Sequence, residues 1–191
     1  MDSDKLYSAD DFVENFEQFL ADSDAYLETL EKYKYLQIGG LSEVSDDELE
    51  DAVMTWMWSK FDENWSNQYE AISALPKPCQ NVFSCRIVID EVNNGGLNQL
   101  FFNSSGQFSV MSIDGFLALG SPELSSIMKE AVALYQQNKE ILDGYDDGTL
   151  ESFSASYEKK IFDKLDESFY SACESIDYVK YIRLNAVCFG A

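Results

Sequence analysis

The sequence predicts an all-α fold, a single compact domain of roughly eight to ten helices with little or no β-structure. Three observations support this class. Apolar residues recur every three or four positions over most of the 191-residue chain. Helix start and stop signals bound these stretches, and no two segments show the clear alternation of paired strands. A hydrophobic fraction of 46% supplies a sizeable core for a chain of this length.

The first third of the chain contains three segments with helical patterns. Apolar residues in 9–35 follow helical spacing. Ser45, with Glu48 three positions later, resembles a capping box and predicts a helix that runs on for about four turns. Residues 62–74 continue the helical spacing, with Trp65 expected to face the core.

Pro76 and Pro78 form the strongest internal boundary, because proline lacks the amide hydrogen that a helix interior requires. We therefore expect two parts. Residues 1–75 would be an acidic N-terminal helical segment packed on the core, and residues 76–191 would be the core itself.

The segment after this boundary, residues 81–92, fits either a buried strand or a helix. A helix is favoured because no partner strand is evident elsewhere. Gly95 and Gly96 then predict a sharp turn, since glycine adopts backbone conformations that other residues avoid. The remaining segments expected to be helical are residues 97–103, 108–119, 122–138, 153–173 and 176–189.

The charge of the chain is strongly negative. It has 35 acidic and 13 basic residues, a net charge of −22. Residues 1–70 hold 19 acids and four lysines, hence −15, and residues 71–191 hold 16 acids and nine basic residues, hence −7. Such a field repels nucleic acid and anionic membranes and attracts basic proteins. Direct binding of nucleic acid is therefore not expected.

Carboxylates in the acidic segment recur one helical turn apart, where neighbouring side chains lie about 5–6 Å from each other. Two interpretations stay open. The rows are a solvated face that keeps the protein soluble, or they imitate the phosphates of duplex DNA, which carry about one charge per 1.7 Å of axis. The candidate partner-binding acids are Asp10, Glu14, Glu17, Asp24, Glu28, Glu31, Asp47, Glu50 and Asp51.

Most catalytic and cofactor chemistry has no counterpart in the sequence. The chain has no histidine, which excludes histidine-based catalysis and histidine-ligated metals. It has neither a P-loop nor a dinucleotide-binding glycine motif. We therefore predict no catalytic, cofactor or metal site and no enzymatic activity. The first residues lack the pattern of a secretory signal, and the apolar runs are too short to cross a bilayer, so a cytoplasmic location is expected.

Residues 89–106 read IDEVNNGGLNQLFFNSSG, and this stretch resembles the signature of the bacterial DNA-mimic (DMP-type) protein family. Residues 165–170 and 181–185 resemble further family elements. The resemblance implies a protein that occupies the DNA-binding face of a basic regulator and that can form a homodimer. The motif residues are Glu91, Asn94, Gly95, Gly96, Gln99 and Asn103. They are interpreted mainly as scaffold, with the polar ones satisfying backbone groups at the turn, and alternatively as the lining of a pocket.

The sequence therefore predicts an acidic protein-interaction domain with a basic protein partner, in the sharpest form a DNA mimic that binds a DNA-binding regulator. The alternative is an inhibitor or immunity partner of a basic toxin or nuclease. A carboxylate-only or metal-dependent hydrolase is the third hypothesis.

Overall fold

The computed structural model describes residues 27–28, 31–37, 39–173 and 176–190. In these residues the chain forms eight α-helices with defined bounds, four short 3-10 helices and no strand, and residues 27–28 and 31–33 are helical as well. This confirms the all-α prediction. The 3-10 helices are Gly40–Glu43, Ser104–Phe108, Tyr157–Lys159 and Ala186–Cys188. The α-helices are α2 (Asp46–Trp58), α3 (Gln68–Ser73), α4 (Lys77–Phe102), α5 (Ser109–Ala118), α6 (Pro122–Asp143), α7 (Leu150–Ser156), α8 (Asp163–Ala172) and α9 (Tyr178–Leu184).

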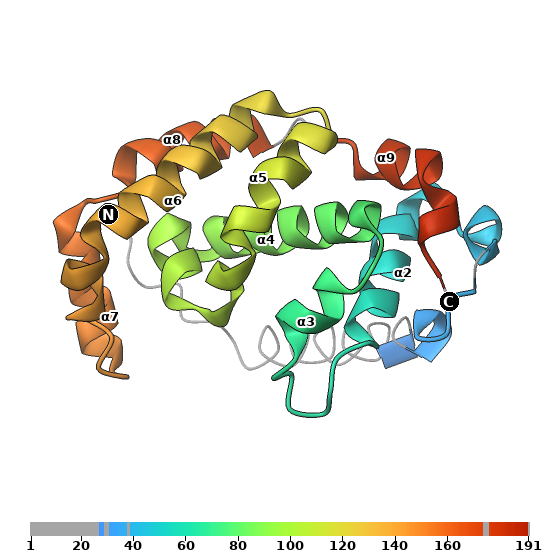
Figure 1. Cartoon of the computed structure of the whole chain (residues 1–191), viewed down its shortest axis with the longest axis horizontal. Helices are drawn as coiled ribbons and strands as arrows, with labels where there is room; N and C mark the ends of the chain where they lie inside the picture. The colour runs from blue at the N-terminus through green and yellow to red at the C-terminus, as the bar shows by residue number, and fades with distance from the viewer. Residues whose placement is uncertain (1–26, 29–30, 38, 174–175, 191) are drawn as a thin grey trace, which may run out of the picture.

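Helix α4 is the central element (Figure 1). Helix α5 crosses it, α6 lies beside α5, and α8 packs against both α6 and α4. Helices α2 and α9 pack together at one end of the molecule, and α7 lies at the other. Gly115 of α5 allows the close crossing, because a Cβ there would lie only 2.6 Å from the Cys85 sulfur of α4.

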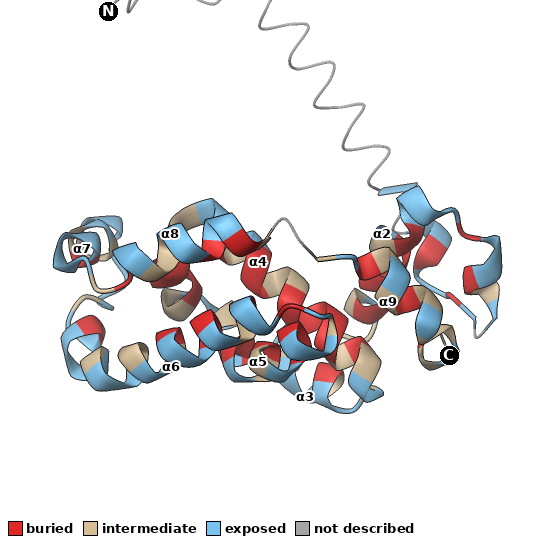
Figure 2. Ribbon diagram, turned by 90° about the horizontal axis from the view of Figure 1, so that it is seen from above, coloured by how far each residue is buried: buried red, intermediate tan, exposed pale blue. Residues whose placement is uncertain are grey.

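The buried side chains form one hydrophobic core, in which the inner faces of the helices meet (Figure 2). Leu49 and Val53 of α2 belong to the same core as Val82 and Val88 of α4. The acidic α2 therefore shares buried apolar contacts with the helix that follows the proline pair. Burial of this kind is the main driving force that holds such helices together. The division of the chain at residue 75 stays a prediction.

Several start and stop signals act as predicted. Residues 81–92 are helical, inside α4. Helix α6 begins at Pro122, and the Ser121 hydroxyl accepts the amide of Leu124, as expected for an N-cap. The helix runs five residues beyond its predicted end, to Asp143. The position of Ser45 is that of an N-cap, yet its hydroxyl makes no capping bond to the backbone.

The prediction that residues 62–74 form one helix is wrong, because only α3 is helical there. The Asp62 carboxylate accepts hydrogen bonds from the amide and the hydroxyl of Ser66, at 2.8 and 2.6 Å. The Asn67 side chain accepts the Asp62 amide. These local bonds compete with the helix for the same backbone groups. Trp65, expected to face the core, is 53% exposed.

The prediction of one helix over residues 153–173 is also wrong. The segment divides into α7, a 3-10 turn and α8, and Lys160 takes a left-handed conformation between them. The break lets Tyr157 donate its hydroxyl to the carbonyl of Gly95 at 2.8 Å. It also buries Phe162, whose ring lies 5.3 Å from that of Phe101. Both contacts are long-range, so periodicity did not reveal them.

A sharp kink at Gly95 and Gly96 divides α4, as predicted. Gly96 has φ 74° and ψ −178°, a region that only glycine adopts readily. Asp166 of α8 accepts the amide of Leu97 at 2.8 Å, just after the kink. Burial raises the pKa of Asp166, and the hydrogen bond from Leu97 opposes that shift. The kink is thus held from outside by α8.

Among the described residues, no helix is long and apolar enough to cross a membrane.

Replacing Gly96 with alanine should destabilise the protein by about 1–3 kcal/mol, from backbone strain alone. The added Cβ would also lie 2.9 Å from an Asp166 oxygen. Chemical denaturation measures the effect. Gly40→Ala is the control, since its Cβ would make only an ordinary 3.6 Å contact. Equal stability of the two variants would contradict the assigned role of the kink.

Candidate interaction surface

The predicted partner-binding acids are only partly covered by the structure. Asp10, Glu14, Glu17 and Asp24 lie outside the described residues. Glu28 and Glu31 are both exposed, and Glu31 lies 3.9 Å from Lys34, its neighbour three positions along the chain. A surface pair of this kind contributes little to stability and leaves the carboxylate accessible.

The three candidate partner-binding acids of α2 divide into two groups. Asp47 and Asp51 are exposed and stand four residues apart, hence on the same side of the helix. Neither forms an ion pair with a described residue. Glu50 instead points toward α4 and accepts a hydrogen bond from Arg86 at 2.6 Å. The structure therefore leaves two of the three carboxylates available to a partner.

Arg86 joins α2 to α4, because it also donates to Asp90 at 2.9 Å. Burial raises the pKa of Glu50, and the guanidinium of Arg86 opposes this shift. The negative charges of Asp51 and Asp90 raise the pKa of Glu50 further. The carboxylates of α2 and α4 are thus close enough to repel one another.

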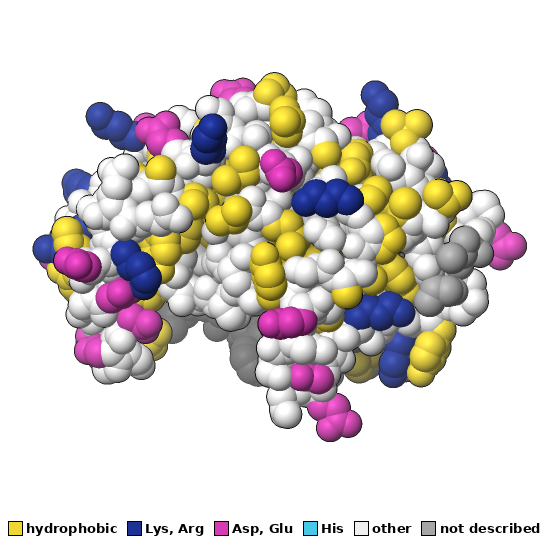
Figure 3. All heavy atoms as spheres, in the orientation of Figure 1, with side chains coloured by type: hydrophobic (Ala, Val, Ile, Leu, Met, Phe, Trp, Pro, Cys, Tyr) yellow, Lys and Arg dark blue, Asp and Glu magenta, His cyan; other side chains and the backbone are white. Residues whose placement is uncertain are grey.

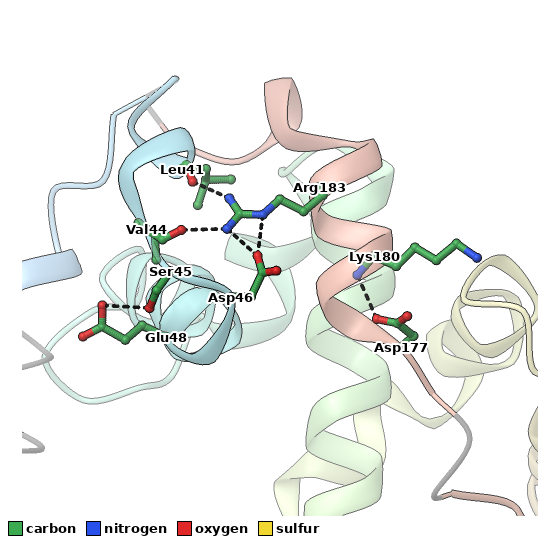
Figure 4. A network of polar contacts seen from close by, with 8 residues as sticks. All are labelled: Leu41, Val44, Ser45, Asp46, Glu48, Asp177, Lys180 and Arg183. Atoms are coloured by element: carbon green, nitrogen blue, oxygen red, sulfur yellow. Dashed lines mark hydrogen bonds and ion pairs between the residues drawn. The ribbon is translucent and has the colours of Figure 1, made fainter.

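A second arginine fixes the start of α2 (Figure 4). Arg183 of α9 donates hydrogen bonds to the carbonyls of Leu41 and Val44, at 2.5 and 2.6 Å. It also binds a carboxylate oxygen of Asp46 through two nitrogens, at 2.9 and 2.6 Å. The planar guanidinium is suited to this fork-like geometry. The N-terminus of α2 is thereby anchored to a helix about 140 positions later in the chain.

The motif residues come together around one carboxylate. Glu91 accepts hydrogen bonds from the side-chain amides of Gln99 and Asn103, at 3.1 and 2.8 Å. Its other oxygen accepts the Ser105 hydroxyl at 2.8 Å. Glu91, Asn94, Gln99 and Asn103 also line a shallow hollow of about 370 Å³. The scaffold and the pocket interpretations therefore both have a geometric basis.

The expectation that these polar side chains satisfy the backbone at the turn needs correction. That task falls to residues of the C-terminal third. Asp166 accepts the amide of Leu97, and Tyr157 and Tyr170 donate to the carbonyls of Gly95 and Val92. Asp166 and Tyr170 lie in residues 165–170, which resemble a further element of the family. The resemblance could therefore have marked both as candidate residues.

Arg86, Arg183 and Ser105 were not predicted as site residues. The chain contains two arginines, and both form ion pairs in the structure. Within the described ranges, no group of three or more potential ligands is placed to hold a metal ion.

Figure 3 shows the face over α5 and α6, in the orientation of Figure 1. Acidic and basic side chains are interspersed on it, around several hydrophobic patches. This face is therefore no continuous negative band.

Replacing Arg183 with lysine should destabilise the protein by about 1–3 kcal/mol, because one ammonium cannot reach all three acceptors. Thermal unfolding measures the effect. Lys180→Arg, one turn away on the same helix, is the reciprocal control, since in Figure 4 the Lys180 side chain points away from the network. If Arg183→Lys unfolds at the same temperature as this control, the anchoring role is wrong.

Replacing Gln99 with leucine removes one of the three donors to Glu91. Two donors remain, so we expect the free energy of unfolding to fall by about 0.5–1.5 kcal/mol. The melting temperature should fall by about 2–5 °C. Glu91→Ala should lower the free energy of unfolding further than Gln99→Leu does, because it leaves three donors without their acceptor. Calorimetry separates the two variants, and unchanged stability of both would count against the scaffold interpretation.

The family of the chain is shown by comparison with family sequence models. The model described as DMP19-like protein matches residues 73–185, more than half of the chain. No curated protein and no solved structure is significantly similar to the chain. The matched range contains the kinked helix, the Glu91 cluster and both arginines. The chain belongs to the DMP19-like protein family.

Proposed function

We propose that this chain is a non-enzymatic, acidic protein-interaction domain that acts as a DNA mimic. Its partner is a basic DNA-binding regulator, whose DNA-binding face it occupies. Family membership supports this proposal, because the family model takes its name from a DNA-mimic protein. The net charge of −22 supports a basic partner, since opposite fields steer two proteins together.

The observation that carries the proposal is the exposed pair Asp47 and Asp51. These carboxylates lie on one side of α2, in the part of the chain with a net charge of −15. Arg86 and Arg183 attach α2 to the rest of the protein. A charged surface held in a fixed geometry loses less conformational entropy on binding than a flexible one.

The first test is competition with DNA. The full chain, immobilised as bait, is offered bacterial DNA-binding proteins eluted from a duplex-DNA column. We expect capture of a regulator at low salt, steep loss of capture as salt rises, and release by added duplex DNA. Capture that resists both salt and duplex DNA would overturn the mimic. A captured nuclease or toxin would favour the inhibitor alternative.

The second test compares two variants of equal charge. Asp47→Asn with Asp51→Asn removes two charges from α2, and Glu130→Gln with Glu140→Gln removes two exposed charges from α6. We expect the α2 variant to bind the captured regulator about three- to tenfold more weakly than the α6 variant. Equal affinities would mean that binding depends on the net charge of the protein and not on the position of Asp47 and Asp51.

A further inference from the structure

A second hollow adjoins the one at Glu91. It has a volume of about 380 Å³ and lies between the second half of α4 and the segment that leads into α7. The two hollows share Gln99 and Asn103. Helix α7 lies at one end of the molecule in Figure 1, away from α9. Together the two hollows form a groove, defined here as the α4–α7 groove.

The end of the groove nearer α7 is lined by aromatic rings. Phe102, Tyr145 and Phe153 line it, and all three are partly exposed. The rings of Phe102 and Phe153 pack edge to face, with centroids 5.1 Å apart. Tyr145 already attracts a cation of the same chain, since the Lys159 nitrogen lies 5.6 Å from the centroid of its ring. These ring faces are therefore suited to cation–π contacts.

The groove also carries negative charge that forms no ion pair with a described residue. The three groups that donate to Glu91 are two amides and a hydroxyl, all of them neutral. Asp146, exposed at the aromatic end, adds a second carboxylate. By contrast, Asp90 and Asp143 are paired with Arg86 and Lys139. Hydrogen bonds from neutral donors orient Glu91 and leave its charge in place.

One ligand chemistry fits both the aromatic rings and the carboxylates of the groove. A guanidinium is planar, stacks on aromatic rings, always carries a positive charge and donates several hydrogen bonds to oxygen acceptors. The groove supplies the rings, the carboxylates and the amide oxygen of Asn103. A nucleotide would meet repulsion between its phosphates and these carboxylates. An ammonium has no planar face to stack on the rings, and it offers fewer donors to the acceptors.

We propose that the α4–α7 groove receives an arginine side chain of the basic partner protein. This inference rests on the proposed function, because the arginine belongs to the proposed basic partner, and it adds a second contact to that of Asp47 and Asp51. Arginine is the side chain that most often reads guanine in DNA, so a DNA-binding face exposes it when DNA is absent. The groove would thus bind a side chain that otherwise contacts DNA.

The test uses a short peptide with two arginines separated by glycines and a matched peptide with lysines, titrated into the full chain. In NMR spectra we expect the arginine peptide to shift amide signals of residues 99–103 and 145–153. Asp146→Asn and Tyr145→Leu should each weaken its binding by about three- to tenfold. Glu140→Gln removes an equal charge from α6 and should leave the affinity within about twofold of wild type.

Two results would overturn the inference: equal affinity for both peptides, or the same affinity in Asp146→Asn and Glu140→Gln. The inference and the proposed function fail separately. If the groove variants capture the regulator as wild type does, the groove is not its binding site, although the mimic stands. If the groove binds arginine and no DNA-binding protein is captured, the groove is an arginine site, but the proposed DNA mimicry is wrong.

Discussion

The arrangement of the polar groups depends on the kink at Gly95 and Gly96. Along a straight helix, at 1.5 Å per residue, Asn103 would lie about 18 Å from Glu91. In the structure their side chains are hydrogen-bonded at 2.8 Å. The kink turns the second half of α4 back toward the first and so creates the Glu91 cluster and the groove. Asp166 holds the amide of Leu97 and fixes this geometry from α8.

The two arginines of the chain have related roles. Arg86 joins Glu50 of α2 to Asp90 of α4, and Arg183 joins the start of α2 to α9. Arg86 neutralises Glu50 and Arg183 neutralises Asp46, whereas Asp47 and Asp51 stay exposed and form no ion pair with a described residue. The few positive charges thus hold an acidic helix in place against the repulsion of its neighbours, which preserves the geometry of the exposed carboxylates.

The sequence was most informative where local rules decide the structure. The helix of residues 81–92, the N-cap at Ser121 and the glycine kink all follow from short-range preferences, and all three were predicted. The helix predictions were wrong where other hydrogen bonds or packing contacts outweighed the local helical preference. Asp62 and Asn67 take backbone groups that a helix over residues 62–74 would need. The break at Lys160 serves contacts with residues some sixty positions earlier, as between Tyr157 and Gly95.

By itself, the sequence determined the helical class, the excess and unevenness of negative charge, and the motif around Glu91. These properties depend on composition and short-range spacing. Only the tertiary structure decided which carboxylates are neutralised, that Glu91 is surrounded by neutral donors, and that aromatic rings of α4 and α7 meet beside it. The physical reason is that the deciding contacts, such as Arg183 with Asp46 and Phe102 with Phe153, join residues far apart in the chain. Helix packing, rather than helix propensity, brings such residues together.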